Sequence, residues 1–251
     1  MNYRLFVLLA VVGLSCSSED DEVISSSDDP EVEVSSIFQQ FTDNVTVYGE
    51  MVNGEPFVVI ETDDVPNHGS PYFDTSDPRY EAYNGTNPDF RLNPNSIVAQ
   101  NIVLKIPMEP RAAENPEATS LGAIGVSLNG VVFYNQYAGP NNQPLTNEIN
   151  SFDQYLGHPQ PQGEYHYHQE PTFLTETLGS DALLGWLLDG FPVYGPMENG
   201  ARVTNANLDD FHGHEHATTD YPDGIYHYHI TDADPYINGS GFYGEAGTVS
   251  N

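Results

Sequence analysis

Two identical tetrapeptides hold four of the nine histidines in the chain. Each reads Tyr-His-Tyr-His, at residues 165–168 and 226–229. In a β-strand, side chains alternate between the two faces, so each tetrapeptide places two imidazoles on one face and two tyrosines on the other. The two imidazoles lie about 7 Å apart at the backbone, which allows both to reach one metal ion. The tetrapeptides therefore predict two metal-binding strands.

A second motif precedes each tetrapeptide and adds a third imidazole. Both copies read Asp-x-x-x-Gly-His, with a turn-rich gap before Tyr-His-Tyr-His. Asp153 and Asp209 either cap a turn or accept a hydrogen bond from the ring nitrogen that does not bind metal. Imidazoles without thiolates suit copper or zinc, in one shared site or in two. The predicted metal ligands are His158, His166, His168, His214, His227 and His229.

The net charge narrows the class of partner. The chain carries six basic and thirty-seven acidic residues, for a formal charge of −31. Binding to nucleic acid needs lysines and arginines that neutralise phosphates, and electrostatic binding to an anionic membrane surface needs them too. We therefore expect no nucleic-acid partner and no electrostatic membrane contact. The surface charge keeps an exported protein soluble and concentrates cations around it.

The N-terminus predicts export and a lipid anchor. Residues 5–14 form an apolar run that is too short to span a bilayer, and it ends near Cys16, the only cysteine. This segment resembles a bacterial lipoprotein signal, which implies a signal peptide at 1–15 and lipidation of Cys16. The following acidic run resembles the surface-export signals of Bacteroidetes-type lipoproteins. The expected location is the outer membrane, with the protein surface-exposed; an ordinary cleaved secretory peptide is the alternative.

The rest of the chain predicts a mainly β fold. An acidic, serine-rich tether at 16–36 precedes a single compact domain at 37–251, which we expect to be sandwich-like with long ordered loops. One or two short helices are expected, at 149–156 and at 180–190, although a strand competes for the second segment. Strands are predicted in the segments rich in β-branched and aromatic residues, at 45–52, 56–62, 96–107 and 123–135.

The chain resembles the YHYH-domain family of bacterial and some eukaryotic extracellular proteins. The resemblance runs from about Ile37 to Gly244 and implies the extent of the domain, but it implies no reaction. Two segments, LDDFHGH and GSGFYG, lack the cysteines that the family often has there, which implies that this chain has no disulfide between those loops. The segments that carry the resemblance are DDVPNHG, GVSLNGVVF, FDQYLGH, GEYHYH, LLDGFPVYGP, LDDFHGH, GIYHYH and DPYINGSGFYG.

Three functions fit these features. The first is a cell-envelope lipoprotein domain that binds a transition metal. The second is a metal-dependent hydrolase in which Asp189 or Asp209 acts as base toward a bound water. The third is a non-enzymatic module that binds glycan or protein through its tyrosines, with structural histidines. Whether the protein is an enzyme, and the role of His68, stay open at this point.

Overall fold

The computed structural model describes residues 32–42 and 44–251. The predicted signal peptide, the lipidation site Cys16 and the tether through residue 31 lie outside the described residues. Residues Glu31–Asn251 group into one compact unit by their contacts. Near its N-terminal end, Val34 packs against the hydrophobic core, and the 3₁₀ helix η1 follows at Ser36–Gln39. Within the described ranges, no helix has the length and apolarity needed to cross a membrane.

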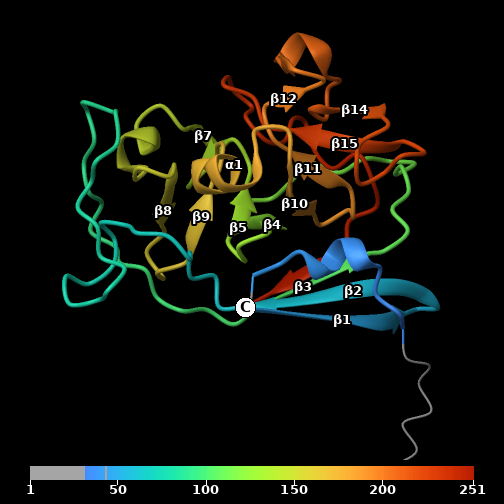
Figure 1. Ribbon diagram of the computed structural model, residues 1–251, viewed down its shortest axis with the longest axis horizontal. Coiled ribbons are helices and arrows are strands. Elements are labelled where there is room, and N and C mark those ends of the chain that lie inside the picture. The colour runs from blue at the N-terminus through green and yellow to red at the C-terminus, as the bar shows by residue number, and fades with distance from the viewer. Residues whose placement is uncertain (1–31, 43) are drawn as a thin grey trace, which may run out of the picture. The chain divides into compact units, whose positions relative to one another are not determined.

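The smaller of the two main sheets has four strands in the order β1-β2-β3-β16 (Figure 1). The β1–β2 hairpin turns at Asn53-Gly54, where both residues have positive φ, as the Asn-Gly pair predicts. The strands of this sheet are β1 at Val45–Val52, β2 at Glu55–Thr62, β3 at Ile102–Pro107 and β16 at Thr248–Ser250.

The larger sheet has eight strands in the order β14-β15-β11-β10-β4-β5-β9-β8, and it crosses Figure 1 from the red end at the right to the yellow end at the left. It contains both Tyr-His-Tyr-His segments, in β9 and β15. Its strands are β4 at Ala123–Ser127, β5 at Val132–Tyr134, β8 at Gly157–Pro159, β9 at Tyr165–Tyr167, β10 at Leu183–Leu187, β11 at Pro192–Tyr194, β14 at Gly213–His216 and β15 at Ile225–His229.

The eight-stranded sheet consists of two equivalent halves. GVSLNGVVFY at 125–134 and GWLLDGFPVY at 185–194 form equivalent hairpins, β4–β5 and β10–β11. In each half the second hairpin strand pairs in parallel with a Tyr-His-Tyr-His strand, and that strand pairs antiparallel with the Gly-His strand.

Between hairpin and Gly-His strand, each half has a short ribbon and a 3₁₀ turn. The first ribbon is β6 at Tyr137–Ala138 with β7 at Gln143–Pro144, followed by η2 at Glu148–Ser151. The second is β12 at Met197–Glu198 with β13 at Ala201–Arg202, followed by η3 at Asn205–Asn207.

The two halves join along an antiparallel seam between β4 and β10. Val126 lies opposite Trp186, and Gly125 lies opposite Leu187. Because Val126 and Trp186 are equivalent positions of the two hairpins, the seam maps onto itself when the halves are exchanged. The large sheet therefore has a pseudo-twofold axis at its centre and a histidine-bearing strand pair at each edge.

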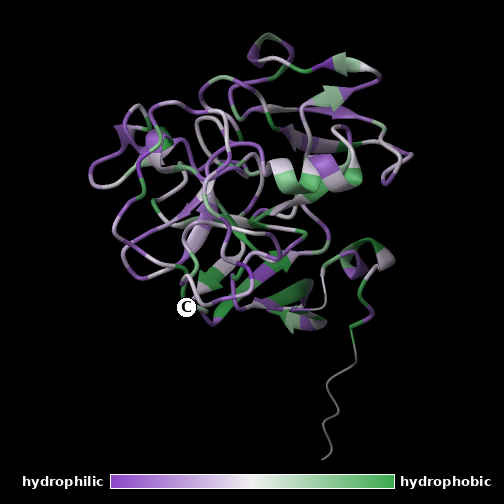
Figure 2. Ribbon diagram, turned by 60° about the vertical axis from the view of Figure 1, so that its left-hand side comes forward, coloured by the Kyte–Doolittle hydropathy of each residue, from purple (hydrophilic) through white to green (hydrophobic). Residues whose placement is uncertain are grey.

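Both main sheets contribute to one hydrophobic core. Ile60 and Leu104 of the small sheet belong to the same buried cluster as Val126, Phe133 and Trp186 of the large sheet. Hydrophobic residues, green in Figure 2, concentrate in the strands, whereas the loops are mainly hydrophilic. The mainly β fold class is confirmed.

The two helix predictions are wrong in detail. Residues 149–156 contain three of the four residues of η2, a 3₁₀ turn and not an α-helix, and 180–190 contain β10, the strand that competed with a helix there. The α-helix of the described chain, α1, lies at Thr172–Leu178. A continuous apolar run fits a strand buried on both faces as well as a helix. Gly185 decides for the strand, because a Cβ there would collide with the carbonyl oxygen of Val126 on the paired strand.

Candidate metal centres

The first centre gathers His158, His166 and His168 at one edge of the large sheet. His158 on β8 lies directly opposite His166 on β9. His168 follows β9 and points to the same face as His166, as strand alternation predicts. All three side chains are buried, and one nitrogen of each lies within 4.8 Å of the others. Three of the six predicted ligands are therefore brought together.

Hydrogen bonds fix which nitrogen of each ring faces the centre. His168 Nδ1 lies 2.6 Å from the Asn135 carbonyl oxygen, and His166 Nδ1 lies 3.2 Å from the Glu164 carbonyl oxygen. A carbonyl only accepts, so both Nδ1 atoms carry the proton and both Nε2 atoms hold a lone pair. The two Nε2 atoms lie only 3.1 Å apart. Two lone pairs that face each other at this distance call for a cation between them.

His158 is held in the same tautomer by a serine. The Ser151 hydroxyl donates to the Glu148 carbonyl oxygen at 2.7 Å, which leaves its oxygen to accept from His158 Nδ1, also at 2.7 Å. His158 Nε2 is buried and has no hydrogen-bond partner. The Glu148 carboxylate approaches this nitrogen at 3.5 Å but does not belong to the group of atoms that converge with the other two rings.

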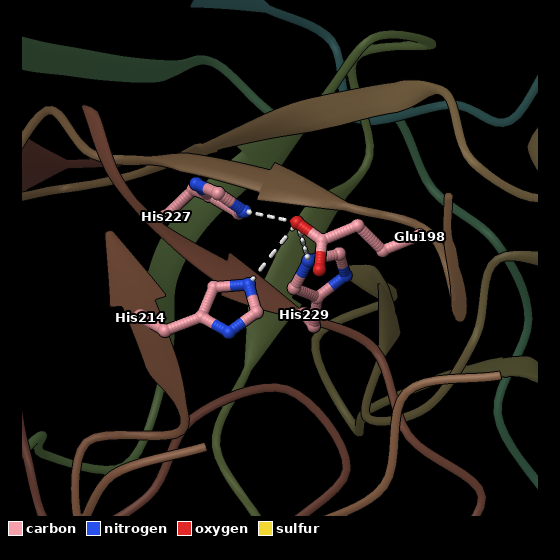
Figure 3. A group of neighbouring side chains, drawn as sticks. All are labelled: Glu198, His214, His227 and His229. Carbon is pink, nitrogen blue, oxygen red and sulfur yellow. Dashed lines mark ion pairs between the residues drawn. The ribbon is translucent and has the colours of Figure 1, made fainter. Parts of the chain in front are cut away.

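The second centre gathers His214, His227, His229 and Glu198 at the opposite edge of the sheet. His214 on β14 lies opposite His227 on β15, as His158 lies opposite His166. Figure 3 shows the three rings and the carboxylate pointing toward one another. Glu198 Oε1 lies 3.4, 3.6 and 3.9 Å from Nε2 of His214, His227 and His229.

Backbone carbonyls orient the second centre as they orient the first. His229 Nδ1 donates to the Gly195 carbonyl at 2.8 Å, and His227 Nδ1 donates to the Ile225 carbonyl at 2.9 Å. Gly195 is equivalent to Asn135 of the first half. The Nε2 atoms of all three histidines are buried without a hydrogen-bond partner. Metal-binding histidines typically donate their other N–H to such a group, which fixes the ring orientation.

The spacing of these atoms fits a metal ion. Ligand atoms bonded at about 2.0–2.1 Å lie about 3.3 Å apart around a tetrahedral ion, and about 2.9 Å apart at a right angle. The 3.1 Å between the two nitrogens of the first centre falls between these values. In the second centre, the distances from Glu198 Oε1 to the three Nε2 atoms, 3.4 to 3.9 Å, are slightly longer than the tetrahedral value. The donor atoms present therefore fit a transition metal in both centres.

Burial keeps the histidines in the neutral form that binds metal. It lowers the pKa of His158 and of His166 well below the usual value, and neighbouring histidines add to the effect. It lowers the pKa of His168 to about 4 and that of His229 to about 4. Because metal ligation needs an unprotonated ring, both centres are ready for metal at neutral pH.

The aspartates of the repeated motif face away from the histidines. Asp153 Oδ2 accepts from the Tyr165 hydroxyl at 2.9 Å, and Asp209 Oδ1 accepts from the Tyr226 hydroxyl at 2.9 Å. Each also accepts from the backbone N–H of the glycine before the motif histidine. The turn-capping alternative is thus confirmed, and the rings are held by carbonyls and Ser151 instead.

Asp189 and His68 also lie on the tyrosine face. Asp189 is fully buried and accepts from the Tyr228 hydroxyl at 2.6 Å. His68 Nε2 lies 2.8 Å from the Tyr167 hydroxyl. Since Tyr167 and Tyr228 point away from the imidazoles of their strands, neither residue reaches a metal centre. The assignment of Asp189 or Asp209 as base of a metal-bound water is therefore wrong.

Glu198 and Ser151 are the functional residues that the sequence did not single out. Glu198 lies two residues after the segment LLDGFPVYGP, which contains no histidine, so nothing in the local sequence relates Glu198 to the histidines. A comparison of the chain with itself at a shift of about sixty residues reveals the hairpin repeat, and with it the ribbon that carries Glu198.

Comparison with protein-family models matches the chain to the family described as "YHYH protein", over residues 103–207 and 197–241. These residues contain both hairpins, both Gly-His strands and both Tyr-His-Tyr-His strands. Comparisons with curated proteins and with solved structures returned no match. The family match covers more than half of the chain. The chain belongs to the YHYH family.

Proposed function

We propose that this protein binds transition-metal ions, copper or zinc, through two histidine centres in a domain that a lipid on Cys16 holds at the cell envelope. The metal proposal rests on the converging atoms of His158, His166 and His168 and of Glu198, His214, His227 and His229. The location rests on the N-terminal sequence pattern alone.

One observation carries the metal proposal. Four imidazole nitrogens, one in the first centre and three in the second, are buried without a hydrogen-bond partner. A buried polar atom without a partner costs about 1–3 kcal/mol, and such atoms are rare in folded proteins. Three of them surround one point in the second centre, and the opposite Nδ1 atoms of His158, His227 and His229 are held by Ser151 or by a backbone carbonyl. This arrangement supports a cation as the missing partner.

The donor atoms favour copper or zinc over other metals. The described residues contain no cysteine, since Cys16 is the only one in the chain and lies outside them. Neutral imidazoles are good ligands for both copper and zinc, and carboxylate oxygen is an additional common zinc ligand. The second centre, with three imidazoles and one carboxylate, has a donor set that suits zinc. The first centre, with imidazoles alone, suits either ion.

Metal analysis of the exported protein tests this proposal. Protein purified without a histidine tag, stripped with chelator and dialysed against zinc or copper, is expected to hold two equivalents by mass spectrometry. Ser76→Ala serves as a control, because this serine lies on an exposed loop and belongs to neither group of converging ligands. Protein that takes up neither metal at neutral pH contradicts the proposal.

The anchor is tested separately. The wild-type protein is expected to fractionate with membranes, and Cys16→Ser is expected to release it or to leave its signal uncleaved. Radiolabelled palmitate marks the wild type alone. A soluble, unlabelled wild type contradicts the lipoprotein assignment but leaves the metal proposal intact.

A metal-dependent hydrolase is the second candidate, and one observation favours it. All three histidines of the first centre line a cleft of about 790 Å³. Glu148 borders the same cleft and approaches His158, so it replaces the aspartates as the carboxylate nearest a metal-bound water. Hydrolysis of activated esters by zinc-loaded protein, lost in His166→Ala, tests this candidate; equal rates in both proteins contradict it.

A further inference from the structure

The two halves of the large sheet differ at one position beside the metal centres. Glu198 of β12 converges with three histidines, whereas its equivalent in β6 is Ala138. Both residues lie in a short antiparallel ribbon, with Ala138 opposite Gln143 and Glu198 opposite Ala201. The backbone is thus repeated, and the carboxylate is present in one half only.

The same difference changes which side chains line the cleft beside each centre. In the second half, Glu198 lines a cleft of about 620 Å³ together with His227 and His229. In the first half, the cleft of about 790 Å³ is lined by all three histidines and by no residue at the Glu198 position. Glu148 lies 3.5 Å from His158 Nε2 at the border of the first cleft, but no carboxylate converges with all three histidines there, whereas Glu198 converges with all three in the second centre.

We propose that the first centre, once loaded with metal, binds an organic carboxylate at an open coordination position, while Glu198 closes the second centre. This inference rests on the proposed metal binding. Metal sites with four protein ligands are closed and structural, whereas sites with three keep a position for an exogenous ligand. Histidines alone supply the converging ligands of the first centre.

Charge and surface character select the class of ligand. Three neutral imidazoles leave both positive charges of a divalent ion uncompensated, which favours an anionic oxygen donor. No lysine or arginine lines the cleft, so the metal itself must attract the anion. The wall is mostly apolar, with Leu121, Tyr134, Tyr137 and Pro140, and this surface suits an organic body larger than that of acetate.

Binding of an organic anion in this cleft should depend on the metal. The Glu148 carboxylate borders the cleft, and no lysine or arginine does. Without a metal, the cleft offers a carboxylate ligand no positive charge. Binding of the organic anion to the metal-free protein is therefore not expected, and this absence is one arm of the test.

Cobalt-loaded variants with one intact centre test the inference. His227→Ala retains the first centre and His166→Ala retains the second; visible spectra report the coordination of Co²⁺ in each. Benzoate and azide are expected to change the spectrum of His227→Ala but not that of His166→Ala. Benzoate should bind about tenfold more tightly than acetate, because its ring buries apolar surface in the cleft. Equal affinities, or a response in both variants or in neither, overturn the inference.

Exchange of the differing residue gives a sharper test. Ala138→Glu, made in the His227→Ala background, is expected to abolish the benzoate response while cobalt stays bound. Glu198→Ala, made in the His166→Ala background, is expected to create an azide response. Cobalt content and circular dichroism identify variants that fail to fold, and Ala138→Gln then provides a neutral replacement of the same size. An unchanged benzoate response in a folded Ala138 variant overturns the inference; failure of the wild type to take up any cobalt overturns the metal proposal itself.

Discussion

The two candidate metal centres share the same scaffold but differ in the side chains that converge. In both, a Gly-His strand, a Tyr-His-Tyr-His strand and a hairpin carbonyl position three imidazoles. Ser151 orients His158 in the first centre, whereas Glu198 enters the second. The strands therefore determine the three-histidine arrangement, and the ribbons and turns between them determine what completes it.

The two faces of the Tyr-His-Tyr-His strands differ in a second way. On the histidine face, buried nitrogens lack partners. On the tyrosine face, Tyr165 and Tyr228 donate to the buried Asp153 and Asp189, and Tyr226 donates to the exposed Asp209. One face is complete within the protein, and the other leaves atoms for a ligand. The tyrosine face therefore fixes the strand within the fold, and the histidine face is the one that can bind a ligand.

Removal of one ligand from each centre has the largest expected effect. His166→Ala should lower the metal affinity of the first centre by about 1,000-fold, and His227→Ala should do the same to the second, because loss of a ligand exceeds the 10–100-fold effect of outer partners. Each variant should retain one equivalent of metal by mass spectrometry. If either substitution empties both centres in a folded protein, the centres are not independent.

Acid should destabilise the metal-free protein through its buried histidines. The pKa of His168 is about 4 in the folded protein, below the unfolded value of about 6.5. The unfolded chain thus binds the proton more readily, so stability is complete above about pH 6.5 and falls as the pH drops toward 4, by about 3 kcal/mol for this residue. Urea unfolding at several pH values measures the slope.

His168→Gln should make that slope shallower, and His229→Gln should do so through the second centre, where the pKa is also about 4. If both variants reduce the pH dependence of the unfolding free energy by similar amounts, the two centres bury their histidines to a similar degree. Stability that does not change between pH 6.5 and 4 contradicts the burial of neutral histidines. Saturating zinc should hold the protein folded further into this range, since metal and protons compete for the same nitrogens.

The tyrosine face should affect stability without affecting metal content. Tyr228→Phe removes a donor to Asp189 and the acceptor for the Tyr243 N–H, so the unfolding free energy should fall by about 2 kcal/mol. Tyr167→Phe is the matched change in the first half, where the hydroxyl contacts His68 and Asn129. Two equivalents of metal are expected in both variants. A variant that is folded but metal-free contradicts the division between the faces.

Ser151→Ala has the smallest expected effect, and it acts on the first centre alone. Loss of the acceptor for His158 Nδ1 should weaken metal binding there by about tenfold. Competition with a chromophoric chelator in the His227→Ala background measures it, and Ser76→Ala, on an exposed loop, is the control. An equal change in the His166→Ala background would place the effect of Ser151 elsewhere in the fold.

The sequence predicts well which histidines converge, because their geometry is local. Alternation along a strand is enough to place His166 with His168, and His227 with His229, on one face. The repeated Gly-His motif likewise identifies His158 and His214 as partners. These six residues converge as expected, in two groups, each with three histidines.

Non-local pairing explains what the sequence does not predict. The seam between β4 and β10 puts the Tyr-His-Tyr-His strands toward opposite edges, which gives two centres instead of one. Glu198 reaches its centre only through the ribbon that follows the second hairpin. The hydrophobic residues of β10 likewise follow each other without the periodicity of a helix or of a half-buried strand, so the strands that pair with β10 determine its conformation.

The self-matching seam between β4 and β10 also bears on the history of the chain. Pairing of one strand with its own equivalent across a twofold axis is the geometry of an isologous dimer. The sheet is in this sense a dimer contained in one polypeptide. In a true homodimer every substitution appears in both subunits, so the two centres could not diverge. Covalent linkage removes this constraint, and it allows the first half to have Ala138 and Asn129 where the second has Glu198 and Asp189.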